Sequence, residues 1–142
     1  MKKTILFLWA VFCFCGLTGC GVRPVSEAAI DYGNSVLYSE EDRRAAVSLI
    51  EAEFCTWEGC ELHSIAYSSD DECNPRNMAW MNELAAADGS TGIMTQCIMF
   101  RSSFHSPKGG GGAWNADQEY TDWQWWLART ENGPWKLMTW GY

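Results

Sequence analysis

Residues 121–142 read TDWQWWLARTENGPWKLMTWGY and carry the strongest structural signal in the chain. The two runs 121–130 and 135–142 are rich in aromatic residues, which β-strands favour. Between them lies Glu131-Asn132-Gly133-Pro134, in which Asn-Gly favours the positive φ of a tight hairpin turn. The pattern therefore predicts two antiparallel strands joined by a hairpin.

Two further strands are expected upstream of this hairpin. Residues 93–104 have the composition of a long strand, and residues 61–67, ELHSIAY, have the length and content of a shorter one. The connection over residues 104–120, FHSPKGGGGAWNADQEY, is too rich in glycine to be regular. We expect these strands and the hairpin to form one antiparallel sheet.

Two helices are also expected. Ser39 is suited to cap a helix that ends near Trp57, because three acids, at 40–42, follow it at the positive end of the helix dipole. Apolar residues recur at helical spacing in this helix, at Ala46, Leu49, Ile50 and Phe54. Asn74 and Pro75 form a cap and first-position pair for a second helix, which Gly89 closes. This order segregates helices from an antiparallel sheet, so the predicted fold class is α+β.

The chain begins with a pattern typical of a secretory signal. Lys2 and Lys3 precede an apolar run, 4–17, that spans about 21 Å as a helix, against about 30 Å for a bilayer core. The tetrad Leu17-Thr18-Gly19-Cys20 resembles the bacterial lipobox, in which the cysteine sulfur receives a lipid and the chain is cut before it. We expect Cys20 to be the lipidated first residue, carrying acyl chains such as palmitate. A signal cut elsewhere, or a buried strand with a chance cysteine, is the alternative.

These features divide the chain into a lipoprotein signal peptide (1–19), a tether (20–37) and a domain (38–142). The alternative for the tether is a helical turn over 28–32 that packs on the domain. Removing the signal takes away two lysines and no acid, so the formal charge changes from −8 to about −10. Such a surface repels phosphate backbones, so we expect no nucleic-acid partner. Two or three acyl chains would hold the domain stably on the extracytoplasmic side of the cell membrane.

Several segments together resemble a family of uncharacterised lipoproteins of Gram-positive bacteria. They are YSEED (38–42), EGCEL (58–62), SPKGGGGAWNADQEYTDWQWWLAR (106–129) and GPWKLMTWGY (133–142). The resemblance implies an NTF2-like cone, a curved antiparallel sheet with helices packed on one side. It implies no activity. Cys55, Cys73 and Cys97 depart from the pattern of the family.

The mature chain beyond the lipidation site contains four cysteines, Cys55, Cys60, Cys73 and Cys97. Outside the cytoplasm an even number favours disulfides, and four cysteines allow three pairings. Cys55 and Cys60 are close across the helix-to-strand turn, and Cys73 and Cys97 would then pair by exclusion, but the sequence leaves the pairing open. Buried thiols are the alternative. Zinc held by Cys55, Cys60, His63 and Cys73 is disfavoured, because the C-x2-C spacing typical of such sites is absent. We therefore expect no metal.

The density of tryptophan suggests a binding surface as well as a core. Trp123 and Trp125 alternate onto one face of their strand with Leu127, which suits a core role, whereas Trp126 takes the other face. Trp126 and Trp114, the latter inside the glycine-rich loop, are our candidates for contact with a ligand such as a glycan.

Support for catalysis is thin, because the chain has two histidines and lacks the common hydrolase, metalloprotease and phosphate-loop motifs. We assign no catalytic residue and no cofactor. The expected function is a non-catalytic binding or envelope-interaction role, with a glycan or an envelope protein as partner. The alternative is a small NTF2-like enzyme that uses an acid or base in the cone, for which His63, Asp117 or Asp122 could serve.

Overall fold

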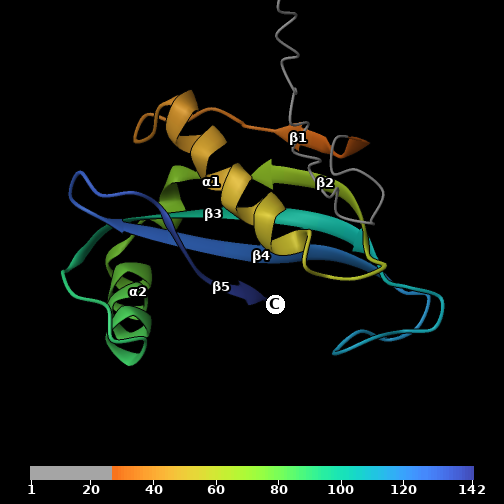
Figure 1. The fold of residues 1–142 in the computed structure, drawn as a ribbon. Helices are drawn as coiled ribbons and strands as arrows, with labels where there is room; N and C mark the ends of the chain where they lie inside the picture. The colour runs from red at the N-terminus through yellow and green to blue at the C-terminus, as the bar shows by residue number, and fades with distance from the viewer. Residues whose placement is uncertain (1–26) are drawn as a thin grey trace, which may run out of the picture.

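The computed structural model describes residues 27–142, so the expected signal peptide, Cys20 and the start of the expected tether lie outside the described residues. Its elements are β1 (Ala29–Asp31), α1 (Glu40–Phe54), β2 (Glu61–Tyr67), the 3-10 helix η2 (Asp70–Glu72), α2 (Pro75–Ala87), β3 (Met94–His105), β4 (Glu119–Thr130) and β5 (Lys136–Gly141) (Figure 1). No helix in this part of the chain is long and apolar enough to cross a membrane. The predicted α+β class is confirmed.

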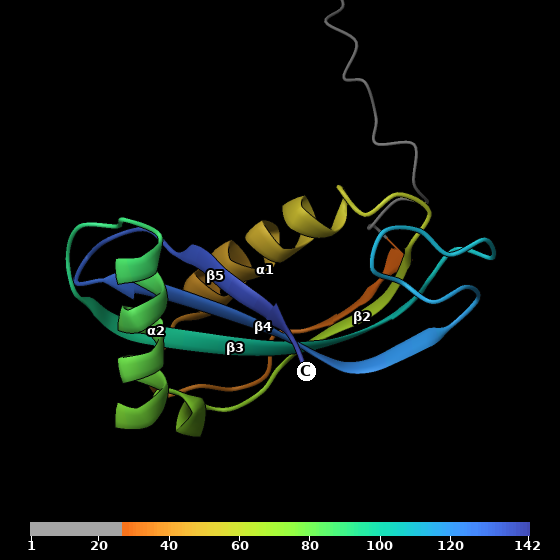
Figure 2. The ribbon, with the colours of Figure 1, turned by 90° about the horizontal axis from the view of Figure 1, so that it is seen from below.

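The five strands form one curved, mixed sheet in the order β1-β2-β3-β4-β5 (Figure 2). Strands β2 to β5 are antiparallel to their neighbours, and β3 and β4 make the long centre of the sheet. The predicted hairpin is confirmed, since Leu127 pairs with Leu137 across it. Asn132 has a φ of 56°, the positive value that the turn requires.

β1 lies in the stretch that we expected to be a tether. Its Ile30 is the register partner of Ile65 in β2, and the two strands are parallel. Ile30 and Tyr32 pack against the main core, and the Arg44 guanidinium lies 4.3 Å from the centre of the Tyr32 ring. Residues 29–31 thus form a strand rather than a tether or a helical turn, because they can extend the sheet beside β2. The folded region begins before residue 38, and the expectation of a wholly antiparallel sheet is wrong at this edge.

The two helices lie on opposite faces of the sheet, not on one side as predicted (Figure 1). The cluster under α1 contains Phe100 and Leu127, whereas the cluster under α2 contains Met99 and Trp126. Successive strand residues point to opposite faces. Because residues 97–100 and 125–128 are buried without interruption, both faces of the central strands need a cover.

Both helices begin where the sequence predicts. Ser39 Oγ accepts from the Asp42 backbone N–H at 3.0 Å, and Ser39 N donates to Asp42 Oδ2 at 3.2 Å, which completes a capping box. Asn74 Oδ1 accepts from Asn77 N at 3.0 Å. Arg129 Nη1 in β4 donates to Asp42 Oδ1 at 2.6 Å, so the N-terminus of α1 is also fixed to the sheet.

Candidate functional site

The space between α1 and the sheet is filled by side chains, many of them aromatic. Trp125, Phe100 and Phe104 are fully buried there, and Trp57 stacks on Trp125 with ring centroids 5.0 Å apart. Trp125 Nε1 donates to Ser102 Oγ at 2.8 Å, which satisfies the buried indole. The buried polar or charged side chains of residues 27–142 are Arg43, Ser102 and Ser106. This part of the chain therefore places no carboxylate or imidazole in its interior.

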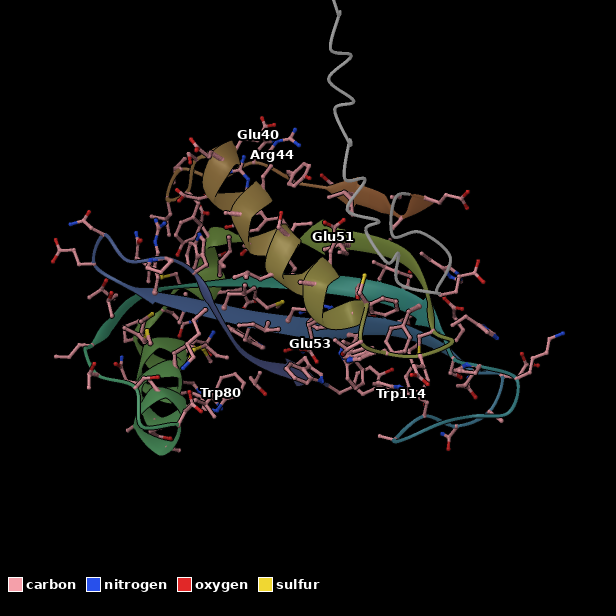
Figure 3. All side chains as sticks on the ribbon, viewed as in Figure 1. Glu40, Arg44, Glu51, Glu53, Trp80 and Trp114 are labelled. Carbon is pink, nitrogen blue, oxygen red and sulfur yellow. The ribbon has the colours of Figure 1, made fainter. Side chains whose placement is uncertain are left out.

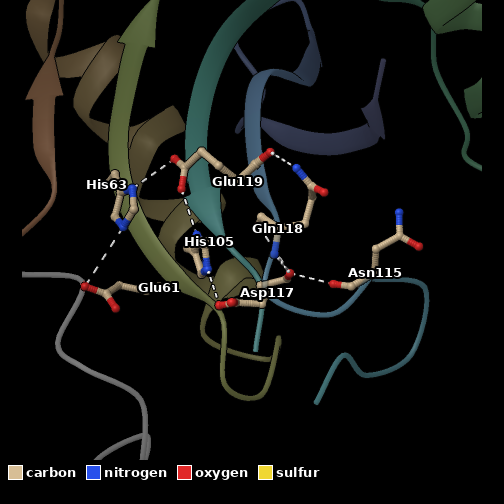
Figure 4. A network of polar contacts seen from close by, with 8 residues as sticks. Glu61, His63, His105, Asn115, Asp117, Gln118 and Glu119 are labelled. Carbon is tan, nitrogen blue, oxygen red and sulfur yellow. Dashed lines mark hydrogen bonds and ion pairs between the residues drawn. The ribbon is translucent and has the colours of Figure 1, made fainter. Parts of the chain in front are cut away.

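A cluster of titratable side chains instead lies on an exposed side of the sheet, where β2, β3 and β4 meet the glycine-rich loop (Figure 4). Glu119 bridges two histidines, with Oε1 3.0 Å from His63 Nδ1 and Oε2 3.0 Å from His105 Nδ1. His105 Nε2 lies 3.0 Å from Asp117 Oδ1, and Glu61 approaches His63 Nε2 at 3.9 Å. His63 and Asp117, which sequence reasoning named separately, thus belong to one network. We call these five residues the histidine network.

The histidine network pairs each histidine with carboxylates, but its side chains are open to solvent. Hydrogen bonds from His105 to Asp117 and then to Glu119 raise the pKa of His105 above its ordinary value of 6.5. The paired side chains are 36–64% exposed, so solvent screens their interactions. Within residues 27–142 no group of three or more histidine, cysteine or acidic side chains is arranged to hold a metal ion. The network can exchange protons, but none of its members lines the groove or the cleft described below.

The glycine-rich loop is held by hydrogen bonds at its base. Ser106 Oγ donates to Asn115 O at 2.6 Å and accepts from Gln118 N at 2.9 Å (Figure 4). Gly110 has a φ of 67°, and a Cβ there would lie 3.1 Å from Trp114 O, so the tight loop requires glycine at this position. The loop therefore has a defined shape despite its composition.

Trp114 anchors this loop against the aromatic core. Its ring centroid lies 4.8 Å from that of Trp57 and 5.2 Å from that of Phe104. A groove of about 490 Å³ opens beside it, lined by the two indoles, Pro107 and the backbone of Gly110–Gly112. We call it the loop groove. Trp114 is half-buried, so its ring both packs and borders an open space.

A second concave site lies where α2 meets β5. This cleft, of about 110 Å³, is lined by four aromatic side chains and two polar ones, Trp80, Trp126, Trp140, Tyr142, Gln124 and Thr139. Trp80, Trp140 and Tyr142 are 38%, 40% and 76% exposed. Trp126 is only 6% exposed, packs edge-on against Trp80 and donates from Nε1 to Gln124 Oε1 at 2.9 Å. We call this site the edge cleft, because β5 is an edge strand.

Aromatic contacts connect the two sites. The Trp123 ring lies 5.2 Å from that of Trp114 and 5.1 Å from that of Tyr142, in edge-on geometry in both cases. Trp140, the register partner of Trp125, also lies 6.1 Å from Trp57. In the view of Figure 3, Trp80 and Trp114 lie on either side of the C-terminal end of β5. The loop groove and the edge cleft are therefore the ends of one aromatic surface.

The two predicted ligand-contacting tryptophans border different ends of this surface, Trp114 the loop groove and Trp126 the edge cleft. Their contact with a ligand stays a prediction. Asp122, the third candidate for an acid or base, is exposed with a φ of 56° and is not a member of the histidine network. The structure therefore does not unite all of the acids and bases that sequence reasoning considered.

The disulfides expected from the cysteine count are not formed in residues 27–142. Cys97 is fully buried, and its Sγ donates to the backbone oxygen of Glu72 at 3.4 Å. Burial, followed by contact with the Cys73 thiol, raises the pKa of Cys97 to about 12. A thiol in such surroundings is a poor nucleophile and behaves as a small apolar side chain. An even count of cysteines could not distinguish this packing role from crosslinking.

Sequence reasoning missed the exposed half of the aromatic surface. Trp80 lies within the predicted second helix, whose burial was not assigned, and α2 buries Met81 and Ala85, four residues apart. A residue adjacent to Met81 is rotated by about 100° from that stripe, and this spacing could have identified Trp80 as exposed. Glu119 was missed because it lay in the stretch expected to be an irregular connection.

No known protein family matches the chain, and comparisons with curated proteins and with solved structures find no match. Fold and site define the protein as an α+β domain with a filled interior and an aromatic surface at one sheet edge.

Proposed function

We propose that this protein is a lipid-anchored, extracytoplasmic binding domain with an NTF2-like fold, and that it recognises a component of the cell envelope through its aromatic surface. The observation that carries the proposal is the convergence of three exposed aromatic side chains, Trp80, Trp140 and Tyr142, on one cleft. Exposed aromatic residues that line a concave site are typical of binding surfaces, since they offer large contact area at low entropic cost.

The N-terminal sequence supports the location. Cys20 follows a charged start, an apolar run and a lipobox-like tetrad, which together are typical of a lipoprotein. A lipid on Cys20 leaves the domain on the outer side of the membrane, within reach of envelope glycans and proteins. The net negative charge argues against anionic partners such as nucleic acids.

The curved sheet and the helix across one of its faces are compatible with an NTF2-like fold. Two features depart from the simple cone that the resemblance implies: β1 pairs in parallel, and α2 covers the opposite face. In addition, the interior is filled by side chains, which favours binding at the outside over chemistry at the inside.

The second candidate function is acid–base catalysis by the histidine network. His105, which bridges Asp117 and Glu119, is the specific observation in its favour, because paired carboxylates can tune a histidine for proton transfer. The exposure of the network and the absence of its members from the lining of the loop groove and the edge cleft weigh against it, since catalytic groups gain most of their effect where water is excluded.

The test is a binding screen by tryptophan fluorescence with the mature chain carrying Cys20→Ser, which removes the lipid and retains every described residue. Neutral glycans, envelope peptides and small apolar molecules form the panel. We expect at least one panel member to bind and to be recovered without chemical change. Trp140→Ala should lower its affinity roughly tenfold or more. Conversion of a panel member to product, lost in His105→Ala and retained in Trp140→Ala, would replace this proposal with the enzyme.

A further inference from the structure

We propose that the ligand of the aromatic surface is an uncharged, linear glycan chain that lies across the end of β5, with one part in the loop groove and another in the edge cleft. This inference rests on the proposed binding function and specifies the class of ligand. It is carried by the spacing of the rings, the polar groups between them and the charges of the lining residues.

The rings form a continuous path rather than two isolated pockets. From the loop groove, Trp114 contacts Trp123, and Trp123 contacts Tyr142, which lines the edge cleft. Each step joins ring centroids a little over 5 Å apart. A path of this kind suits an extended chain of repeated units better than one compact molecule, because successive units meet successive rings.

The polar groups of the edge cleft suit a sugar. One face of a pyranose ring presents C–H groups that pack on an indole, while its edge presents hydroxyls that need partners. Gln124 and Thr139 supply an amide and a hydroxyl among the aromatic rings of the cleft. The hydrogen bond from Trp126 Nε1 occupies Gln124 Oε1 and fixes the amide, so its N–H donors point away from Trp126.

The loop groove offers a comparable combination. Its apolar floor is formed by Trp57 and Trp114, and its wall is formed by three consecutive glycines, Gly110–Gly112. Glycine has no side chain to cover its backbone groups. Gly110 N donates to Pro107 O and Gly111 O accepts from Trp114 N within the loop, but a carbonyl oxygen can accept a second hydrogen bond. Hydroxyl groups, which both donate and accept, are suited to such a wall.

The charges of the two sites favour a neutral chain. Glu58 is the one charged side chain that lines the loop groove, and no charged side chain lines the edge cleft. Neither site offers an arginine or lysine to an anionic polymer, and the chain as a whole is acidic. A cationic ligand would find a single carboxylate. Uncharged glycans remain the class that matches both the rings and the charges.

A ligand that reaches both sites should bind more tightly as it lengthens, because the second contact becomes intramolecular once the first is made. The experiment titrates the mature Cys20→Ser chain with a length series of uncharged glucose and N-acetylglucosamine oligomers, starting from the single sugars. We expect the affinity for at least one series to increase with length and then level off.

Variants at the two ends test the path. Trp80→Ala and Trp114→Ala should each lower the affinity for the longest oligomer roughly tenfold or more. Each should also flatten the dependence on length. Ile93→Ala removes an exposed apolar side chain away from both sites, 75% exposed, and should change nothing. Near-ultraviolet circular dichroism checks that each variant is folded. If Trp114→Ala does not fold, Trp80→Ala alone provides the test.

Three results would overturn the inference. They are the absence of binding by every oligomer, an affinity independent of length, and equal binding by wild type and both tryptophan variants. A different outcome is that the peptides or small apolar molecules of the panel bind in a manner that depends on Trp140 while the oligomers do not bind. In that case the inferred class of ligand is wrong and the proposed binding function stands. If Trp140→Ala affects no ligand, the binding function itself fails.

Discussion

Trp57 and Trp125 stack with an interplanar angle of 22° and centroids 5.0 Å apart, although one follows α1 and the other lies in β4. Their exposures are 9% and 0%. This stack closes the space between the end of α1 and the sheet. Because side chains fill this interior, the loop groove and the edge cleft lie at the outside of the molecule.

Trp125→Ala should destabilise the protein by about 3 to 5 kcal/mol, because it leaves a cavity and removes the partner of Ser102 Oγ. Urea unfolding followed by circular dichroism measures the loss. Trp140→Ala, on the neighbouring strand but 40% exposed, is the matched control and should cost about 1 kcal/mol or less. Equal losses in the two variants would contradict the assignment of interior and surface.

Deleting residues 20–37 should leave a folded but weaker domain. The deletion removes the β1–β2 pairing, the packing of Ile30 and Tyr32, and the hydrogen bond from Val36 N to Asp70 Oδ2 at 2.8 Å. These losses amount to about 2 to 4 kcal/mol. A chain that starts at residue 27 is the control and should match the mature protein. If the chain from residue 38 is equally stable, β1 contributes nothing to the core.

The stability contributed by His105 should fall as the pH rises. Asp117 and Glu119 raise the pKa of His105 in the folded protein above the ordinary 6.5. The stabilisation is therefore fully present at a pH below the pKa of the unfolded state, and it is lost as the pH rises through the pKa of the folded state. The free energy of unfolding of wild type should therefore exceed that of His105→Gln by more at about pH 6 than at about pH 9. Because the network is exposed, we expect a small difference. An NMR titration midpoint of His105 at or below 6.5 would contradict the network.

The proposed lipid anchor on Cys20 is tested by metabolic labelling with a fatty acid. The wild-type chain should incorporate the label and fractionate with membranes, and Cys20→Ala should do neither, because the sulfur that accepts the lipid is gone. Cys97→Ala is the control and should be labelled normally, since Cys97 is buried in the fold. Label that persists in Cys20→Ala would place the lipid elsewhere.

Local sequence signals predicted most of the elements. The cap residues Ser39 and Asn74, together with the Asn132-Gly133 turn, define their own short-range hydrogen bonds and φ values, so they can be read without tertiary information. The short strand at Ala29–Asp31 could not be read this way, because its three residues form a strand only beside β2. The placement of α2 on the second face likewise depends on tertiary packing.

The candidate site was less accessible to sequence reasoning. Trp114 and His63 were visible as unusual residues, but which partners they meet depends on the register of β2, β3 and β4. Glu119 joins His63 to His105 only because these strands bring all three to one side of the sheet. The edge cleft depends on contact between α2 and β5, which no local pattern describes.

We propose that the protein binds through its aromatic surface and does not use its histidines for chemistry. The most direct measurement is a parallel calorimetric titration of one ligand into wild type, Trp140→Ala and His63→Ala, with product analysis of each mixture. We predict that Trp140→Ala weakens binding roughly tenfold or more, that His63→Ala equals wild type, and that the ligand is recovered unchanged. Binding unaffected by Trp140→Ala, together with turnover that His63→Ala abolishes, would contradict the account.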